Sequence, residues 1–448
     1  MSRRKSRNKA QTKPSEELSI ESFSHDGRGI ARVDGKTVFV SNALPGEKVL
    51  ARYTLVKSKF DEAETEEVIQ ASPDRVEPRC AHFGVCGGCS LQHYDANAQI
   101  QSKQESLLEL LRSVGKTEPG EILPPLTADN WGYRRKARLG VRYVQKKGRV
   151  LVGFREKNSR YLADISQCVV LDARIGERLI QLGECIKSMQ ARETIPQVEV
   201  AAGDDEVALV VRHLEPLIQS DIEKLIQFGR DYNFKLWLQP KGPDTAHRIG
   251  IDSEEDNKKP LRYRLSEFDI DVAFLPTDFT QVNASLNQKM VSLALSFLDV
   301  QQDEEVLDLF CGLGNFSLPL ATKAKHVVAV EGDKGLVERA RANAERNGID
   351  NIEYHIANLF EEFQQLPWAR KQYDKILIDP PRSGAWEVAS NLKRLNPQRL
   401  VYISCDPATL ARDVEEIVHR QGYRLVRAGV MDMFPGTTHV ESIAVFEP

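Results

Sequence analysis

The sequence has no apolar run of the length that a membrane-spanning helix requires, which is about 18 consecutive residues. Its amino terminus is basic but has no apolar stretch of the kind that a secretory signal peptide carries. We therefore expect a soluble, cytoplasmic protein with no membrane contact. Apolar residues make up 41% of the 448 residues, so the chain is long and apolar enough to form several domains with sizeable cores.

The sequence also lacks a strong net charge, because 61 basic and 65 acidic residues leave only −4. Any nucleic-acid contact must then come from local basic patches. Residues 1–14 are predicted to be a disordered basic arm, which either is a solvated tail or touches RNA. The segment Trp131–Leu139 combines four cations with two aromatic residues, a pattern that favours phosphate binding and base stacking over a merely charged strand face. Its residues are Trp131, Tyr133, Arg134, Arg135, Lys136 and Arg138.

Cysteine is scarce and unevenly distributed. Three of the seven cysteines (Cys80, Cys86 and Cys89) lie within ten residues of one another. In a reducing cytosol such a cluster favours a metal site over disulfides. Cys185 lies in a helical apolar pattern and Cys311 in a glycine-rich turn, so we expect both to be packed core residues.

The pattern of apolar residues divides the chain into three folded parts. Residues 15–73 show short strands with frequent turn signals, which predicts a small β-barrel of the oligonucleotide-binding kind. Residues 74–272 are predicted to form a β-rich central domain that begins with the cysteine-bearing loop. A helix predicted at about 97–114 could pack on the last domain. Residues 273–448 alternate buried apolar strands with helices, which predicts a doubly wound α/β sheet ending in an antiparallel edge.

The last domain lacks two common nucleotide-binding signatures. A strand runs into a glycine-rich turn at Val306–Phe316, but Ser317 stands where the third glycine of a dinucleotide fingerprint belongs. No loop carries the Gly-Lys-Ser/Thr that holds a triphosphate. Glu331 ends the next strand, where an acid can accept hydrogen bonds from a ribose, and Asn358 at the end of the third strand could read an adenine edge. An adenosine-bearing ligand without a pyrophosphate indicates S-adenosylmethionine.

Cys405 lies at the carboxyl end of the fifth predicted strand, the edge where ligands bind in such sheets. A cysteine there is a candidate nucleophile, although a small buried core residue is the alternative. Methylation of uracil at carbon 5 would require such a thiol, because carbon 5 becomes nucleophilic only after a thiolate has added to carbon 6. A base must then remove the carbon 5 proton, and Glu441 in the last strand is our assignment. Addition requires access to the ring face, so the base must be flipped out or lie in a loop.

Five motifs in this order along the chain resemble those of the RNA uracil-C5 methyltransferases. They are Phe279-x-Gln281-x-Asn283, Asp308–Phe316, Asp379-Pro-Pro-Arg-x-Gly384, Ser404–Pro407 and His439-Val-Glu441. One departure is Asp406, where the family usually has Asn. The resemblance implies a Rossmann-like class I methyltransferase domain with Cys405 as nucleophile and Glu441 as base. It also implies cofactor contacts from Gln281, Phe310, Asn315, Glu331, Asn358 and Asp379.

The amino-terminal half narrows the resemblance to one branch. Cys80, Cys86, Cys89 and Cys168 resemble the ligands of a [4Fe–4S] cluster in this family, with zinc as the alternative for four thiolates. Residues 15–73 resemble a TRAM domain. With both the four cysteines and the TRAM-like segment, the sequence resembles the branch of the family that methylates uracil 1939 of 23S ribosomal RNA. This resemblance implies 23S ribosomal RNA as the partner.

Three other functions are compatible with parts of the sequence. Methylation of transfer RNA would use the same chemistry on another substrate, and a non-catalytic RNA-binding scaffold would leave Cys405 inert. A radical S-adenosylmethionine enzyme is disfavoured, because its three cysteines have a different spacing from Cys80, Cys86 and Cys89. No motif implies a protein partner, and we expect a monomer.

Overall fold

The computed structural model describes residues 13–24, 26–157, 159–250 and 259–448, so the predicted basic arm lies almost entirely outside the described residues. The chain forms two compact units, one ending at Ser102 but including Gly436–Thr438, the other comprising Lys103–Pro435 and His439–Pro448. In the part of the chain that is described, no helix has both the length and the apolar character needed to cross a bilayer.

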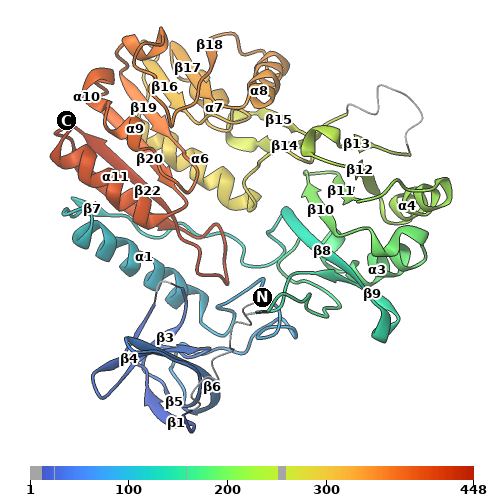
Figure 1. Ribbon diagram of the computed structural model, residues 1–448. Coiled ribbons are helices and arrows are strands. Elements are labelled where there is room, and N and C mark those ends of the chain that lie inside the picture. The colour runs from blue at the N-terminus through green and yellow to red at the C-terminus, as the bar shows by residue number, and fades with distance from the viewer. Residues whose placement is uncertain (1–12, 25, 158, 251–258) are drawn as a thin grey trace, which may run out of the picture. The chain divides into compact units, whose positions relative to one another are not determined.

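The first unit is a six-stranded sheet around a small apolar core (Figure 1). Turn residues separate short segments in which apolar side chains alternate with polar ones, so that one face of each strand is buried. Val38, Val40, Val49 and Ala51 are fully buried in that core. The strands are β1 (Glu16–Ser19), β2 (Ser22–Phe23), β3 (Gly29–Val33), β4 (Lys36–Ser41), β5 (Lys48–Val56) and β6 (Phe60–Gln70), and they pair in the order β1-β5-β6-β4-β3-β2.

The cysteine-bearing loop that follows β6 is tied to this sheet by a buried ion pair. Arg75 donates from Nη2 to Oε2 of Glu47 at 2.8 Å, and Glu47 is only 1% exposed. The same carboxylate accepts the backbone N–H of Leu44 at 2.8 Å. A buried charge that is paired and hydrogen-bonded in this way holds the start of the loop in one place.

The second unit contains a β-rich part, as the sequence predicts. Its sheet has the order β13-β12-β11-β10-β8-β9, and α3 packs against β9. A separate hairpin follows it and leads into the last domain. The elements are β8 (Lys136–Val144), β9 (Arg149–Gly153), α2 (Ala173–Gly176), α3 (Leu179–Lys187), β10 (Gln197–Ala202), β11 (Val207–Arg212), α4 (Gln219–Tyr232), β12 (Phe234–Gln239), β13 (His247–Arg248) and the hairpin β14 (Leu261–Leu265) and β15 (Ile270–Phe274).

The rest of the second unit is a doubly wound α/β sheet, which confirms the predicted fold class. Strands β16 to β20 are parallel, and the antiparallel β22 lies between β20 and β21. Helices α9 to α11 lie on one side of the sheet and α6 and α8 on the other (Figure 1). The elements are α6 (Ala284–Leu298), β16 (Glu305–Leu309), α7 (Ser317–Ala321), β17 (His326–Glu331), α8 (Lys334–Arg346), β18 (Ile352–Ile356), β19 (Lys375–Ile378), α9 (Trp386–Ala389), α10 (Leu392–Leu395), β20 (Arg399–Ser404), α11 (Pro407–His419), β21 (Arg424–Met431) and β22 (Glu441–Glu447).

An earlier segment of the chain completes the edge of this sheet. Strand β7 (Glu121–Ile122) pairs in parallel with β21. The helix α1 (Ala96–Ser113) was predicted at about 97–114, and its Lys103 forms a buried ion pair of 2.7 Å with Asp432, just after β21. Both side chains are less than 5% exposed, so each charge depends on the other for compensation.

Candidate active site

The glycine-rich turn after β16 has a strained backbone at the predicted cofactor edge. Phe310 has a φ of 64°, which is unfavourable for a bulky residue, and Gly312 and Gly314 follow with φ values of 54° and 94°. The backbone N–H of Phe310 is held by the carbonyl of Val330 at 2.9 Å. Strain of this kind persists only where the surroundings enforce it, and it is concentrated at ligand sites.

Ser317 has a structural reason to replace the third glycine. It is fully buried and donates its hydroxyl hydrogen bond to Oδ2 of Asp308, which is 1% exposed in β16. Burial raises the pKa of Asp308 to about 7, and the hydroxyl of Ser317 opposes that rise. The serine therefore supports a buried carboxyl group beneath the glycine-rich turn.

Glu331 ends β17 as predicted and is half-buried. Its Oε2 accepts the backbone N–H of Gly312 at 3.1 Å, and its Oε1 accepts those of Gly332 and Asp333 at 2.7 and 3.0 Å. The carboxylate thus joins the glycine-rich turn to the next strand, and its remaining lone pairs are available to a ligand at this edge.

The two predicted asparagines are placed differently. Asn315 exchanges side-chain hydrogen bonds of 2.9 and 3.0 Å with Asn287 of α6. Asn358 is exposed and lies two residues beyond the end of β18 rather than on it. Its Nδ2 donates to Glu361 at 2.7 Å, a surface contact that a ligand could displace.

Gln281 is half-buried and lies just before α6. It lines a small cavity of about 20 Å³ with Tyr263 and Asn287, among others. In the same motif Phe279 is 70% exposed, and the fully buried Asn283 caps α6 by accepting the N–H of Leu286 at 3.1 Å. The motif thus combines a helix start with an exposed aromatic ring.

Strand pairing brings the predicted nucleophile and the predicted base together. Ser404 at the end of β20 is opposite Ser442 of β22, so the next residues in this antiparallel register, Cys405 and Glu441, also face each other. Glu441 is 3% exposed and Cys405 is half-buried. Burial, together with the charges of Glu441 and Asp379 and against the opposing charge of Arg382, raises the pKa of Cys405 to about 12.

Asp379 follows β19 at the same edge and is half-buried. Burial raises its pKa well above the usual range, and the nearby charges of Glu441 and Asp308 act in the same direction. Three carboxyl groups and a thiol therefore share a region of low polarity at the carboxyl ends of β16, β19 and β20. Such a region favours a cationic ligand.

Asp406, the one departure from the family motif, caps α11. Its Oδ1 accepts the backbone N–H groups of Ala408 and Thr409 at 3.0 and 3.2 Å. Asn and Asp are about equally good at this position, which explains why either residue can follow the cysteine.

The assignment of site residues from sequence missed His439 and Arg382. Nε2 of His439 lies 3.4 Å from Oε2 of Glu441, and Nη2 of Arg382 lies 3.4 Å from Nδ1 of His439. Both residues stand in the motifs quoted above. The signal that could have found His439 is its spacing of two from Glu441, which is typical of side chains on one face of an extended segment.

Comparison with known proteins decides the family. The family model described as tRNA (Uracil-5-)-methyltransferase matches residues 95–447, and the TRAM domain model matches residues 15–65. The chain belongs to the tRNA (uracil-5-)-methyltransferase family. The 23S rRNA (uracil(1939)-C(5))-methyltransferase RlmD of Xanthomonas campestris pv. campestris (strain 8004) is 51% identical to it over 446 residues, which is 99% of each chain.

Two further proteins align over nearly the full length of the chain. RlmD of Francisella tularensis subsp. novicida is 50% identical over 434 residues, which is 96% of each chain. The crystal structure of the Pyrococcus abyssi tRNA (uracil-54, C5)-methyltransferase in complex with S-adenosyl-L-homocysteine aligns with a TM-score of 0.72 and 24% identity, covering 96% of this chain and 100% of that one. This structural likeness confirms the fold. The predicted TRAM domain and methyltransferase domain are both confirmed.

The four cysteines of the predicted cluster are divided between the two units, with Cys168 in the second and the others in the first. None of the seven cysteines, all of which are described, forms a disulfide. Among the described residues, no three His, Cys, Asp or Glu side chains are grouped closely enough to hold a metal ion. Within the first unit, the backbone N–H of Gly88 points to Sγ of Cys86 at 3.4 Å, as amides do toward cluster-bound sulfur.

The basic segment Trp131–Leu139 requires a correction. Arg135 forms an ion pair with Asp204, and Lys136 donates to the carbonyls of Pro276, at 3.0 Å, and Asp278. Burial lowers the pKa of Lys136 to about 8. Two more of the six predicted contacts, Tyr133 and Arg134, donate to the carbonyls of Pro435 and Lys136. Of the four cations, Arg138 alone is well exposed, at 74% of its side chain.

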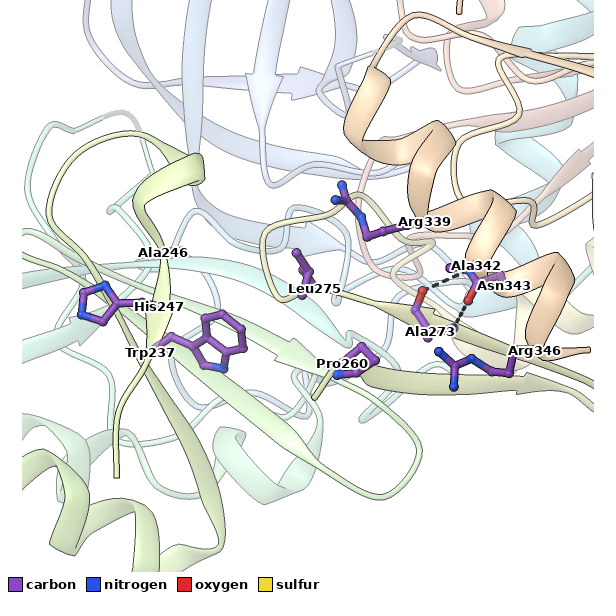
Figure 2. Close-up of a pocket in the computed structure, with 10 residues that line it drawn as sticks. All are labelled: Trp237, Ala246, His247, Pro260, Ala273, Leu275, Arg339, Ala342, Asn343 and Arg346. Atoms are coloured by element: carbon purple, nitrogen blue, oxygen red, sulfur yellow. Dashed lines mark hydrogen bonds between the residues drawn. The ribbon is translucent and has the colours of Figure 1, made fainter. Parts of the chain in front are cut away.

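A cavity elsewhere in the second unit contains none of the predicted residues. It has a volume of about 470 Å³ and lies between β12 and α8. Figure 2 shows Arg339 and Arg346 of α8 facing it from one side and Trp237 from the other. Arg339 is engaged with Asp278 at 2.7 Å, so the cavity wall is partly neutralised.

Proposed function

We propose that the protein is an S-adenosylmethionine-dependent methyltransferase that forms 5-methyluridine at uracil 1939 of 23S ribosomal RNA. The single observation that carries the chemistry is the register that sets Cys405 opposite Glu441 beside Asp379. The choice of substrate rests on relatives of that name that match the full length of the chain at 51% identity. A ribosomal RNA substrate implies a cytoplasmic location, and the monomeric state stays a prediction.

The reaction needs a nucleophile and a base on the same uracil ring. Sγ of Cys405 adds to carbon 6, which converts the ring to an enolate with a nucleophilic carbon 5. When bound, S-adenosylmethionine supplies an electrophilic methyl group on a sulfonium. After carbon 5 has been methylated, Glu441 removes the carbon 5 proton, the ring double bond re-forms and the thiolate of Cys405 leaves.

Arg382 and His439 keep Glu441 ready to act as a base. Arginine can only donate, so the hydrogen bond from Arg382 makes Nδ1 of His439 the acceptor. The hydrogen of the neutral ring is then on Nε2, which faces the carboxylate of Glu441 at 3.4 Å. Arg382 and His439 together therefore position the carboxylate of Glu441 opposite Cys405.

The proposed cofactor contacts suit a sulfonium ligand to different degrees. Glu331 supplies a carboxylate at the edge of the sheet, and Asp379 supplies a buried carboxyl group that a cationic ligand would favour in its ionised form. Phe310 supplies the strained turn against which an adenosine could pack. Gln281 and Asn358 have side chains that a ligand could reach. Asn315 stays a proposed cofactor contact, and its side chain is already positioned by hydrogen bonds to Asn287 of α6.

We also propose a [4Fe–4S] cluster held by Cys80, Cys86, Cys89 and Cys168. The support is the chemistry of the donors, which are four thiols outside any disulfide, and the amide directed at Cys86. Aerobically purified protein should be brown, and replacing any of the four by alanine should remove the colour. Cys185→Ala is the matched control and should stay brown, whereas stoichiometric zinc without iron would overturn the assignment.

The substrate is tested by offering the two RNA classes separately. Purified protein with radiolabelled cofactor should methylate a 23S transcript, and the product should vanish when the target uridine is changed to cytidine. Transfer RNA is the second candidate, since the family model carries that description and the aligned Pyrococcus enzyme acts on uracil 54 of tRNA. Methylation of transfer RNA alone would move the substrate to that class. The absence of methyl transfer to either RNA would favour the scaffold hypothesis.

A further inference from the structure

One segment of the second unit has a charge that the rest of the chain does not share. Between Lys136 and Arg160 there are nine Lys or Arg residues and one acid, a net charge of +8. The whole chain carries −4, so all other residues together carry −12. A local excess of this size in an acidic protein is typical of a surface that meets a polyanion.

The structure gathers part of this charge on one face. Arg138 and Arg142 lie on the same side of β8, separated by Gly140, and both are exposed. The loop after β9 folds back on itself, with Arg155 bridged to Leu162 and the N–H of Glu156 bonded to the carbonyl of Tyr161 at 2.9 Å.

The loop packs on the strand between the two arginines. A side chain at Gly140 would come within 2.5 Å of the Leu162 side chain, so the loop lies directly against this glycine. The loop brings three further exposed residues, Arg155, Arg160 and Tyr161, to the region of Arg138 and Arg142. These five residues are called the basic hairpin surface: Arg138, Arg142, Arg155, Arg160 and Tyr161.

Most of the charge on the basic hairpin surface is not neutralised by the protein. Arg138 contacts Glu199 at 3.0 Å, but its side chain is 74% exposed. Within the described part of the chain, no acid forms an ion pair with Arg142, Arg155 or Arg160. By contrast, Lys147 and Arg149 at the far end of the hairpin both pair with Asp164.

The aromatic residue of this surface distinguishes RNA from an acidic protein. Tyr161 is 63% exposed, and the guanidinium carbon of Arg160 lies 5.6 Å from the centre of its ring. Exposed aromatic rings stack on unpaired bases, and arginine binds phosphates while also stacking on base planes. An acidic protein partner would need cations but would gain nothing specific from a lone tyrosine.

The surface starts next to the candidate active site. The N–H of Arg135, just before β8, donates to the carbonyl of Val282, and Nζ of Lys136 donates to the carbonyls of Pro276 and Asp278, just before Phe279. From Lys136, strand β8 reaches Arg142 in six residues, which at about 3.3 Å per residue is roughly 20 Å. The cations therefore extend outward from the segment that contains Gln281.

We propose that the basic hairpin surface binds the sugar–phosphate backbone of the RNA substrate beside the target uridine, with Tyr161 stacking on an unpaired base. This inference rests on the proposed function. It adds a binding site for RNA, separate from the TRAM domain, that positions the strand leading to the methyltransferase domain.

The test compares two variants with equal loss of charge. One carries Arg138→Gln, Arg142→Gln, Arg155→Gln and Arg160→Gln. The control neutralises four exposed cations on other elements in the same way: Arg230, Lys241, Lys325 and Arg420. Binding of a 23S transcript is titrated at salt concentrations from 50 to 200 mM, and methylation is measured at saturating RNA.

In the four-arginine variant, but not in the control, the slope of log affinity against log salt should be less steep than in the wild type by about three. The reason is that each phosphate contact contributes about 0.7–0.9 to that slope. A slope difference of three over this fourfold salt range means that wild-type affinity falls about 60-fold more than that of the variant. Turnover at saturating RNA should stay near wild type with a raised KM. Tyr161→Ala should weaken binding on the order of tenfold without changing the slope.

Equal slopes in the two variants would overturn the proposal, as would a fall in turnover with an unchanged KM. If wild-type protein fails to methylate the transcript, the proposed function fails, but the salt slopes still decide the basic hairpin surface. Because all four arginines are exposed, urea midpoints of both variants should equal that of the wild type. A variant that unfolds early would show that the arginines stabilise the fold instead.

Discussion

Replacing Glu441 by glutamine should make Cys405 more reactive while stopping the reaction. The pKa of the thiol is raised to about 12 by burial and then by the charges of Glu441 and Asp379. Residues directly opposite in an antiparallel pair have Cα atoms about 5 Å apart. A unit charge at about 5 Å in an effective dielectric of 20 is worth about 3 kcal/mol, or roughly a hundredfold in thiolate population.

The gain in rate is smaller than the gain in thiolate, because a thiolate of lower basicity is a weaker nucleophile. With a Brønsted coefficient of about 0.4–0.5, a hundredfold larger thiolate population corresponds to roughly tenfold faster alkylation. The assay is alkylation by iodoacetamide between pH 7 and 9 without RNA or cofactor, with mass spectrometry of the peptide that contains Cys405. This readout separates Cys405 from the other six cysteines.

The control is Glu441→Asp, which keeps the negative charge and should alkylate at a rate close to wild type. If glutamine gives no acceleration, the electrostatic account of this thiol is wrong. If aspartate accelerates the reaction as much as glutamine does, access rather than charge limits the rate. With RNA and cofactor present, Glu441→Gln should also accumulate a covalent RNA–protein adduct that survives denaturation, and its absence would count against Glu441 as the base.

Three further predictions concern single side chains. Cys405→Ala should abolish methylation but retain cofactor binding in a calorimetric titration, and near-normal turnover would exclude it as the nucleophile. Asp308→Asn should have a larger free energy of unfolding than wild type at pH 8, by at most about 4 kcal/mol. The reason is that the pKa of Asp308 is higher in the folded than in the unfolded protein, so the wild type loses stability as the pH rises from about 4 through 7. Urea unfolding at several pH values checks this, and a difference that does not fade toward pH 4 would refute it. Lys103→Met should cost about 3–5 kcal/mol by leaving Asp432 buried and unpaired, and the double variant with Asp432→Leu should recover part of that loss in the same unfolding measurement.

Much of this protein is readable from the sequence because it depends on local patterns. The period of apolar residues distinguished the short strands of the first unit from the buried parallel strands of the second, and the doubly wound sheet confirms that inference. The position of Glu331 at a strand end followed from the same rhythm, because strand ends are marked by nearby turn residues. The motifs themselves indicated the family, which the comparisons confirm.

Other features depend on packing between distant segments and could not be read this way. The four cations of the segment Trp131–Leu139 look alike in sequence, but burial against Pro276 and Asp278 removes Lys136 from the surface and leaves Arg138 exposed. The loop that brings Arg160 and Tyr161 toward β8 is likewise set by contact with a glycine.

The catalytic pair shows the same division between local and distant effects. The sequence by itself determined that Cys405 follows the fifth strand and that Glu441 lies in the last one, since both follow from local alternation and turn signals. Only the tertiary structure decided that β22 inserts beside β20 in the register that makes the two residues face each other. The physical reason is that strand register is selected by the total burial and hydrogen bonding of the whole sheet, to which no single segment contributes enough to show in its own sequence.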